Sequence, residues 1–215
     1  FLAAEGFMAL TAPVPRAARA GDLLLALVLT THTATLTAPD GWETLTHLTA
    51  PTNALAAIWL LRHRIEDLEP ATHEFSVDAG AAWGAVLLYR GLAEAGVVAS
   101  VAADQASSAS HKTPSATATT YSDLLVGVWA EYGAAVWTAP GTMTERFNAF
   151  DGVGPTTRTI LVADQLPGVT GSIGGSTATV SPAATAIACS IMLAASPPPR
   201  AVAITRPTPG AFGIR

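Results

Sequence analysis

The chain has 215 residues, of which 50% are hydrophobic and only 13% are charged, and its formal net charge is -5. This length allows one large all-β domain or two small domains with a proper core. Lys and Arg total 11 and never form a run, which argues against nucleic-acid binding. No stretch approaches the roughly 20 apolar residues of a membrane span. The low charge suits a protein whose surface is partly covered by neighbours.

Short apolar runs bounded by Gly, Pro, Asp or Ser follow one another along the chain, and they predict strands rather than helices. Two further segments alternate apolar and polar residues, which is typical of half-exposed strands. The runs are "DLLLALVLT" (22–30), "ALAAIWLL" (54–61), "AAWGAVLLY" (81–89), "DLLVGVWA" (123–130), "RTILVA" (158–163) and "AIACSIML" (186–193), and the alternating segments are "HEFSV" (73–77) and "TATVS" (177–181). We expect one helical turn, in the charged segment "RHRIEDLEP" (62–70).

Two blocks of the sequence repeat in the same order. "DLLLALVLTTHTATLTAP" (22–39) aligns without gaps over "DLLVGVWAEYGAAVWTAP" (123–140), at an offset of 101 residues. "FSVDAGAAWGAVLL" (75–88) aligns over "VSPAATAIACSIML" (180–193), at an offset of 105. A period near 100 is too long for a solenoid repeat or a propeller blade. The repeat therefore predicts two related halves of one sandwich.

These patterns together predict an all-β fold, a pseudo-symmetric β-sandwich of jelly-roll type with eight or more strands. We expect a single domain over residues 1–194, with one half over about 1–105 and the other over about 106–194. The segment 195–215 is rich in proline and predicts an extended C-terminal arm on a neighbouring subunit, or else a flexible terminus. The residues expected to make subunit contacts in the arm are Pro197, Pro198, Pro199, Val202, Ile204, Phe212 and Ile214.

A search for catalytic, nucleotide-binding and metalloprotease motifs finds none. The Gly-rich stretch "GVTGSIGG" (168–175) predicts a hairpin loop. Asp22 and Asp123 open equivalent strands, so we expect both to cap the backbone of the preceding turn. Glu66, Asp67 and Glu69 crowd one turn, which favours a solvated charged loop over a general acid and base. We therefore expect a non-enzymatic protein without a cofactor or a metal.

The histidines and the single cysteine are also expected to have structural or surface roles. The five histidines lie well apart in sequence, which favours surface or interface positions over metal ligation. They are His32, His47, His63, His73 and His111. His73 and Glu74 cannot share one strand face, because adjacent side chains point to opposite faces. Cys189 lies in an apolar run, which predicts a buried and inert thiol.

The five tryptophans allow a second hypothesis, a carbohydrate-binding module or host-recognition adhesin. Trp83 and Trp129 are expected in the core, and Trp42 at the end of the sandwich. Trp59 and Trp137 are open between core packing and an exposed platform for sugar stacking. In this alternative the glycan contacts would be Trp137, Asn148 and Asp151. A concanavalin-like glycan lyase or hydrolase ranks last, because the strands supply almost no paired carboxylates.

The order of these motifs resembles a family of actinobacterial phage structural proteins. The motifs are "GDLLLALV" with "TAPDGW", then "AAWGAVLLYRG", then "TAPGTMTER" and finally "TGS" with "TATVS", and together they span residues 3–194. The resemblance implies a jelly-roll or concanavalin-like sandwich on the virion surface, as a capsid decoration protein or a minor tail protein. It implies no catalytic residues. The partners would be other virion proteins, and the chain itself would form a homo-oligomer, for which a trimer is a reasonable guess.

Phe147 and Phe150 complete the set of expected subunit contacts. They stand in the segment "PGTMTERFNAFDGVG" (140–154), which the sequence predicts to be rich in turns. Aromatic side chains in exposed loops and at sheet edges are typical of subunit interfaces. The first hypothesis is therefore a virion structural protein that binds its particle, and a host glycan is an optional further partner.

Overall fold

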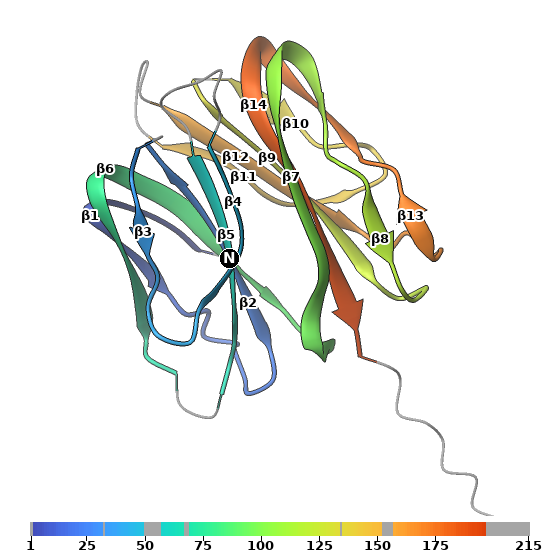
Figure 1. Ribbon diagram of the computed structural model, residues 1–215, viewed down its shortest axis with the longest axis horizontal. Helices are drawn as coiled ribbons and strands as arrows, with labels where there is room; N and C mark the ends of the chain where they lie inside the picture. The colour runs from blue at the N-terminus through green and yellow to red at the C-terminus, as the bar shows by residue number, and fades with distance from the viewer. Residues whose placement is uncertain are drawn as a thin grey trace, which may run out of the picture.

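The computed structural model describes residues 2–31, 33–49, 57–66, 69–133, 135–151 and 157–196. Every regular element in these ranges is a β-strand, which confirms the all-β prediction. Among the described residues there is no helix that could cross a membrane. The strands form two large antiparallel sheets and a small two-stranded one (Figure 1). The seven subunit contacts expected at residues 197–214 of the C-terminal arm lie outside the described residues.

The first sheet is built from the N-terminal part of the chain, and its order is β1-β6-β2-β5-β4, with β3 paired to β6. Its strands are β1 (Leu2–Pro13), β2 (Leu23–Thr30), β3 (Leu36–Thr37), β4 (Glu43–Thr49), β5 (Ala57–Arg64) and β6 (Thr72–Tyr89). The predicted helical turn is wrong at its beginning, because Arg62–Arg64 continue β5 and pair with β2. The apolar run of β5 extends its hydrogen-bonded ladder into these charged residues.

The second sheet has the order β10-β14-β9-β12-β11, with β7 paired to β14. Its strands are β7 (Leu92–Lys112), β9 (Leu124–Tyr132), β10 (Val136–Thr138), β11 (Thr144–Asp151), β12 (Arg158–Gln165) and β14 (Thr177–Ala195). A two-stranded sheet of β8 (Ala116–Ala118) and β13 (Gly171–Ile173) lies beside it. The prediction that 140–154 is rich in turns is wrong over Thr144–Asp151, because this segment forms β11 and pairs with β12.

The two large sheets follow the same strand order, with β1, β6, β2, β5 and β4 in one and β7, β14, β9, β12 and β11 in the other. The strand pairing does not follow the offset of 105 residues that the sequence alignment gave for the second block. Leu24 pairs with Leu88 and Leu125 with Met192, so the offset from 88 to 192 is 104. The pairing of each long strand, β6 and β14, contains register shifts. One extra residue at such a shift moves every later side chain to the other face of the sheet, so the offset between the two strands can change along their length. Sequence duplication remains a prediction.

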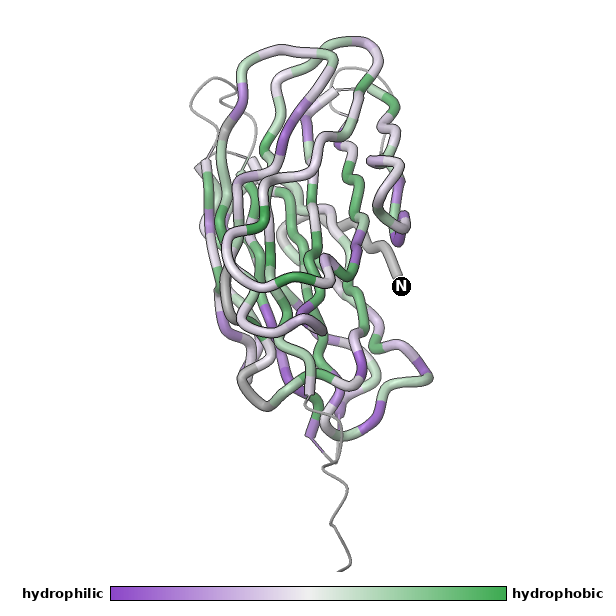
Figure 2. Tube along the Cα trace, turned by 90° about the vertical axis from the view of Figure 1, so that its right-hand side faces the viewer, coloured by the Kyte–Doolittle hydropathy of each residue, from purple (hydrophilic) through white to green (hydrophobic). Residues whose placement is uncertain are grey.

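The inner faces of the two sheets pack against each other and form one core. Leu27 of β2 and Val128 of β9 belong to it, and so do Trp83 and Cys189, as the sequence predicted. Complete burial raises the pKa of the Cys189 thiol and keeps it protonated. Figure 2 shows the apolar residues gathered along the middle of the strands, with polar residues toward the ends. The molecule is therefore a β-sandwich.

The outer faces are covered as well, and this explains why β2 is buried along its whole length. The first part of β6 folds over the outer face of its own sheet, where Phe75 and Val77 pack on Leu24. Gly80 lies in the bend, with a φ of 74° and with Thr31 Oγ1 only 2.8 Å from where a Cβ would stand. A side chain at this position would strain the bend. The outer cluster formed in this way places the candidate site.

Asp22 and Asp123 hold the turns that lead into β2 and β9, as predicted. Asp22 Oδ2 accepts a hydrogen bond of 3.0 Å from the Arg19 backbone N–H. Asp123 Oδ2 accepts from the backbone N–H groups of Thr119 and Thr120, at 2.6 and 2.9 Å. Both carboxylates are buried. They are backbone caps in both sheets.

Candidate functional site

The expected subunit contacts outside the arm, Phe147 and Phe150, lie in very different environments. Phe147 is 5% exposed and belongs to the core between the sheets, so it is not available to a partner. Phe150 is 70% exposed, and it stands on β11 at the edge of the second sheet. The prediction of a subunit contact is therefore wrong for Phe147 and stays a prediction for Phe150.

The expected glycan platform is not formed. Trp137 is 2% exposed, and its indole Nε1–H donates a hydrogen bond of 3.0 Å to Thr159 Oγ1. Asn148 is exposed and donates to the Trp137 carbonyl and to Glu145. Asp151 ends β11, and its side chain lies outside the described part of the structure. Because Trp137 is buried in the outer cluster of the second sheet, it offers no face on which a sugar can stack.

A cluster of two imidazoles and a carboxylate lies on the outer side of the first sheet. His63 is the second-last residue of β5, His73 is the second residue of β6, and Glu69 comes from the loop between these strands. His63 Nε2 lies 2.7 Å from Glu69 Oε1, and His73 Nε2 lies 3.2 Å from Glu69 Oε2. One potential ligand atom from each of the three residues lies within 4.8 Å of the others. We call these three residues the His–Glu–His cluster.

Trp42 holds the two imidazole rings in place. Its ring stacks on His63 with a centroid distance of 5.3 Å, and it meets His73 edge to face at 5.2 Å. The same indole packs edge to face on Phe75 of the outer cluster. Trp42 thus limits the orientation of both imidazoles, and its expected place at the end of the sandwich stays a prediction.

The proton on His63 is located by a backbone contact. His63 Nδ1 lies 2.9 Å from the Gly41 carbonyl oxygen, which can only accept, so Nδ1 carries a hydrogen. The other ring nitrogen, Nε2, faces the carboxylate of Glu69. This arrangement of an imidazole held through its other nitrogen is typical of metal-ligating histidines.

Burial and charge set the protonation of the other two groups. Burial alone raises the pKa of Glu69, but the hydrogen bonds from His63 and the Glu66 backbone, together with the two imidazoles, bring it below its usual value. Burial, helped by the charge of His63, lowers the pKa of His73. Glu69 is thus ionised and His73 neutral near neutral pH.

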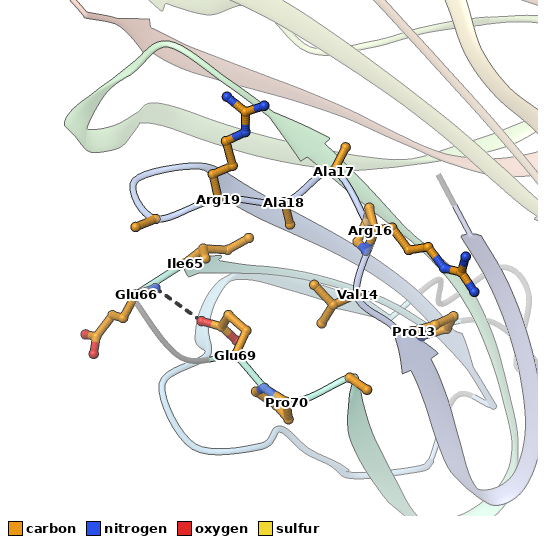
Figure 3. A pocket seen from close by; sticks show the side chains of 13 residues that line it. Pro13, Val14, Arg16, Ala17, Ala18, Arg19, Ile65, Glu66, Glu69 and Pro70 are labelled. Atoms are coloured by element: carbon orange, nitrogen blue, oxygen red, sulfur yellow. Dashed lines mark hydrogen bonds between the residues drawn. The ribbon is translucent and has the colours of Figure 1, made fainter.

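The cluster opens on a cleft of about 470 Å³, which is lined by further carboxylates. Asp40, Glu66 and Glu74 contribute acidic groups to its wall, and none of its described lining residues is Lys or Arg. Glu69 also borders a second cleft, beside the segment 13–20 (Figure 3). There the Glu66 backbone N–H donates to Glu69 Oε1 at 3.2 Å, and the side chains of Arg16 and Arg19 point away from Glu69. The local charge favours a cation.

Two sequence interpretations are corrected by this geometry. The side chains of His63, Glu69 and His73 are only 11%, 12% and 5% exposed, so they are neither surface histidines nor part of a solvated loop. The expectation that His73 and Glu74 face opposite ways is confirmed, because His73 is buried and Glu74 is exposed. The sequence signal for the cluster was the spacing His-x5-Glu-x3-His across one strand–loop–strand unit.

The other histidines do not extend the cluster. His47 is exposed and stacks on Trp59 at 3.6 Å, as expected of a surface residue. His111 is completely buried, which contradicts the surface interpretation. Its ring nitrogens face Gln105 Oε1 and the Ser108 carbonyl, at 3.0 and 2.9 Å. His32 lies outside the described residues.

Comparisons of the chain with protein-family models, with curated proteins and with solved structures found no match.

Proposed function

We propose that the chain is a non-enzymatic structural protein of a bacteriophage particle, displayed on the virion surface as a capsid decoration protein or as a minor tail protein. The motif order that resembles actinobacterial phage structural proteins supports this proposal, and so does the low content of charged residues. The β-sandwich is a compact unit suited to display on a particle.

The distribution of exposed apolar side chains is the observation that carries the proposal. Within the described residues, the six large apolar side chains that are strongly exposed stand on strands of the second sheet or in the loops beside β9 and β12. They are Val101, Tyr121, Val136, Phe150, Leu166 and Val169. Large exposed apolar side chains that occur on one sheet and not on the other favour an interaction surface on that sheet. We propose that the second sheet faces the particle.

The edge strand β11 offers a specific place for this contact. It is the last strand of its sheet, and within the described residues no further strand pairs with its free edge. An unpaired edge presents backbone N–H and C=O groups to an extended segment of a partner. Phe150 stands on this strand and would be the anchoring side chain.

The buried carboxylates support a structural role over catalysis. The buried acidic residues of the described chain are Asp22, Asp123, Glu131 and Asp164. Each is held by a partner: Asp22 by Arg90, Asp123 by two threonines, Glu131 by the Ala135 backbone and Asp164 by Arg146. Groups engaged in this way stabilise turns and strand ends.

The proposal is tested on particles of the phage whose genome encodes the chain, prepared with and without the gene. The recombinant full chain is added to the particles that lack it, and bound copies per capsid subunit are counted by quantitative mass spectrometry after sedimentation. We expect binding at a fixed stoichiometry and a cryo-EM density over the capsid or the tail. That map also gives the position of residues 195–215 and the oligomeric state.

Phe150→Ser and His47→Gln form a matched pair for this assay, because both residues are exposed and lie on different sheets. We expect the first variant to bind at least about tenfold more weakly and the second to bind like the parent chain. Native particles without a copy of the chain, together with no rebinding, would overturn the proposal.

A further inference from the structure

We propose that His63, Glu69 and His73 form a binding site for one Zn²⁺ ion, with three protein ligands and a fourth position that takes water from the adjacent cleft. The inference is independent of the proposed role on a virion.

Three potential metal ligands converge at this place in the fold. His63 Nε2 lies 2.7 Å from Glu69 Oε1, and His73 Nε2 lies 3.2 Å from Glu69 Oε2, so both imidazoles direct a ring nitrogen at the same carboxylate. His63 Nδ1 lies 2.9 Å from the Gly41 carbonyl oxygen, which leaves Nε2 as the ligand atom of this ring. One ligand atom from each residue lies within 4.8 Å of the others, so a single ion can contact all three.

The surroundings of His73 also favour a metal ion. His73 Nε2 is buried and has no hydrogen-bond partner, although Glu69 Oε2 lies 3.2 Å away. The distance between His73 Nε2 and Glu69 Oε2 is short enough for an ion pair, but the two atoms do not have the geometry of a hydrogen bond. A buried nitrogen without a partner is costly. Coordination to a metal held between the three residues would satisfy it.

The donor set selects the metal. Two imidazole nitrogens and one carboxylate oxygen suit Zn²⁺, whereas Ca²⁺ and Mg²⁺ require mostly oxygen ligands. In a tetrahedral site with bonds of about 2.1 Å, neighbouring ligand atoms lie about 3.4 Å apart. The atoms here, 2.7 Å apart at the nearest pair and within 4.8 Å overall, need only side-chain shifts on the order of 1 Å to reach that geometry.

The surroundings favour binding and an open position. Asp40, Glu66 and Glu74 line the cleft and add negative charge. Among the described hydrogen bonds, only the backbone N–H of Glu66 joins one of these residues to a ligand, Glu69. Trp42 packs on both imidazoles and limits their rotation. Three protein ligands with a solvent-facing fourth position are the pattern of zinc sites that keep an exchangeable ligand.

The test is isothermal titration calorimetry of the untagged full chain with ZnCl₂. We expect one Zn²⁺ per chain with a Kd of about 1 µM or lower. His73→Gln and Glu69→Gln should each weaken binding by more than about 100-fold. His47→Gln should leave the Kd unchanged, since His47 lies outside the cluster and stacks on Trp59. Thermal unfolding without zinc checks that each variant folds.

X-ray absorption at the zinc edge gives a second readout on the unaltered chain. We expect a four-coordinate shell of nitrogen and oxygen with scattering from two imidazole rings. The proposal is overturned if the chain binds no zinc at 100 µM ZnCl₂ (about 100 times the expected Kd), or if the bound ion shows no imidazole scattering. It is equally overturned if His47→Gln weakens binding as much as His73→Gln.

Discussion

The two large sheets share their turns but differ in the side chains that those turns carry. The Asp22 N–H donates to the Arg19 carbonyl before β2, and the Asp123 N–H donates to the Thr120 carbonyl before β9. The Trp42 N–H donates to the Pro39 carbonyl in the same way as the Met143 N–H, 101 residues further on, donates to Pro140. The backbone therefore repeats at places where the surface does not.

The two sheets differ in the residues beside the first turns of their central strands, β2 and β9. Leu24 of β2 pairs with His63, whereas Leu125 of β9 pairs with Gln165. Met143 stands at the position that corresponds to Trp42, and it packs in the outer cluster of the second sheet together with Trp129 and Trp137. The strongly exposed apolar side chains stand instead on the second sheet and in its loops. One strand order thus supports a polar, cation-attracting end in one sheet and an apolar surface in the other.

Leu27→Ala has the largest expected effect and tests whether the two sheets form one cooperative unit. Leu27 is completely buried in the core that both sheets share, so its truncation should lower the free energy of unfolding by about 3 kcal/mol. Val128→Ala in the facing sheet should cost about 2 kcal/mol. Urea unfolding should show one transition for both variants. Two separate transitions, with only one of them shifted, would break the comparison.

Asp123→Ala and Asp22→Ala compare the two caps directly. Asp123 accepts hydrogen bonds from the backbone and hydroxyl groups of Thr119 and Thr120, and its removal leaves these donors without a partner. We expect a loss of about 3 kcal/mol. Asp22→Ala should cost less, about 1–2 kcal/mol, because its partner Arg90 is half exposed and can turn to water. Equal losses in thermal unfolding would contradict this ranking.

The same cap should give the protein a sensitivity to acid. Burial alone raises the pKa of Asp123, but the hydrogen bonds from Thr120 and Thr119 outweigh it and lower the pKa to about 2. Because the pKa is lower in the folded state, the contribution is complete above about pH 5 and is lost as the pH falls toward 2. It amounts to about 2 kcal/mol.

Asp123→Asn is the control for this pH dependence, since an amide does not titrate. The difference in free energy of unfolding between the parent chain and Asp123→Asn should shrink by about 2 kcal/mol between pH 7 and pH 2. Urea titrations at several pH values measure it. Parallel curves for the two proteins would show that Asp123 does not titrate as described.

Phe150→Ser has the smallest expected effect on stability and sharpens the functional side of the comparison. The side chain is 70% exposed, so the free energy of unfolding should change by less than about 0.5 kcal/mol. A larger loss in thermal unfolding would mean that Phe150 packs within its own chain. In that case the apolar surface of the second sheet would lose its proposed anchor.

The strands were predictable because their signals are local. β2 and β9 are mainly apolar runs that begin after an aspartate, and their side chains are buried on both faces of the sheet. The capping roles of Asp22 and Asp123 followed from their equivalent places in the repeat. The strand β11 was missed because Glu145 and Arg146 interrupt its alternation, at the position where its pairing with β12 shifts.

The His–Glu–His cluster was not predictable in the same way. Its formation depends on the bend of β6, which carries His73 over the outer face of its own sheet. No local pattern fixes where a strand leaves one layer for another. Trp42 joins from a turn about 20 residues earlier in the chain. The burial of Phe147 and Trp137 likewise depends on packing between elements, which residue type alone does not determine.

The most direct test of the difference between the two sheets is a crystal structure of the full chain grown with ZnCl₂, with anomalous diffraction measured on both sides of the zinc edge. One anomalous peak bonded to His63, Glu69 and His73, with none beside Met143 and Gln165, is the predicted result. No peak at the cluster, or a peak of similar height at the corresponding end of the second sheet, would contradict the account.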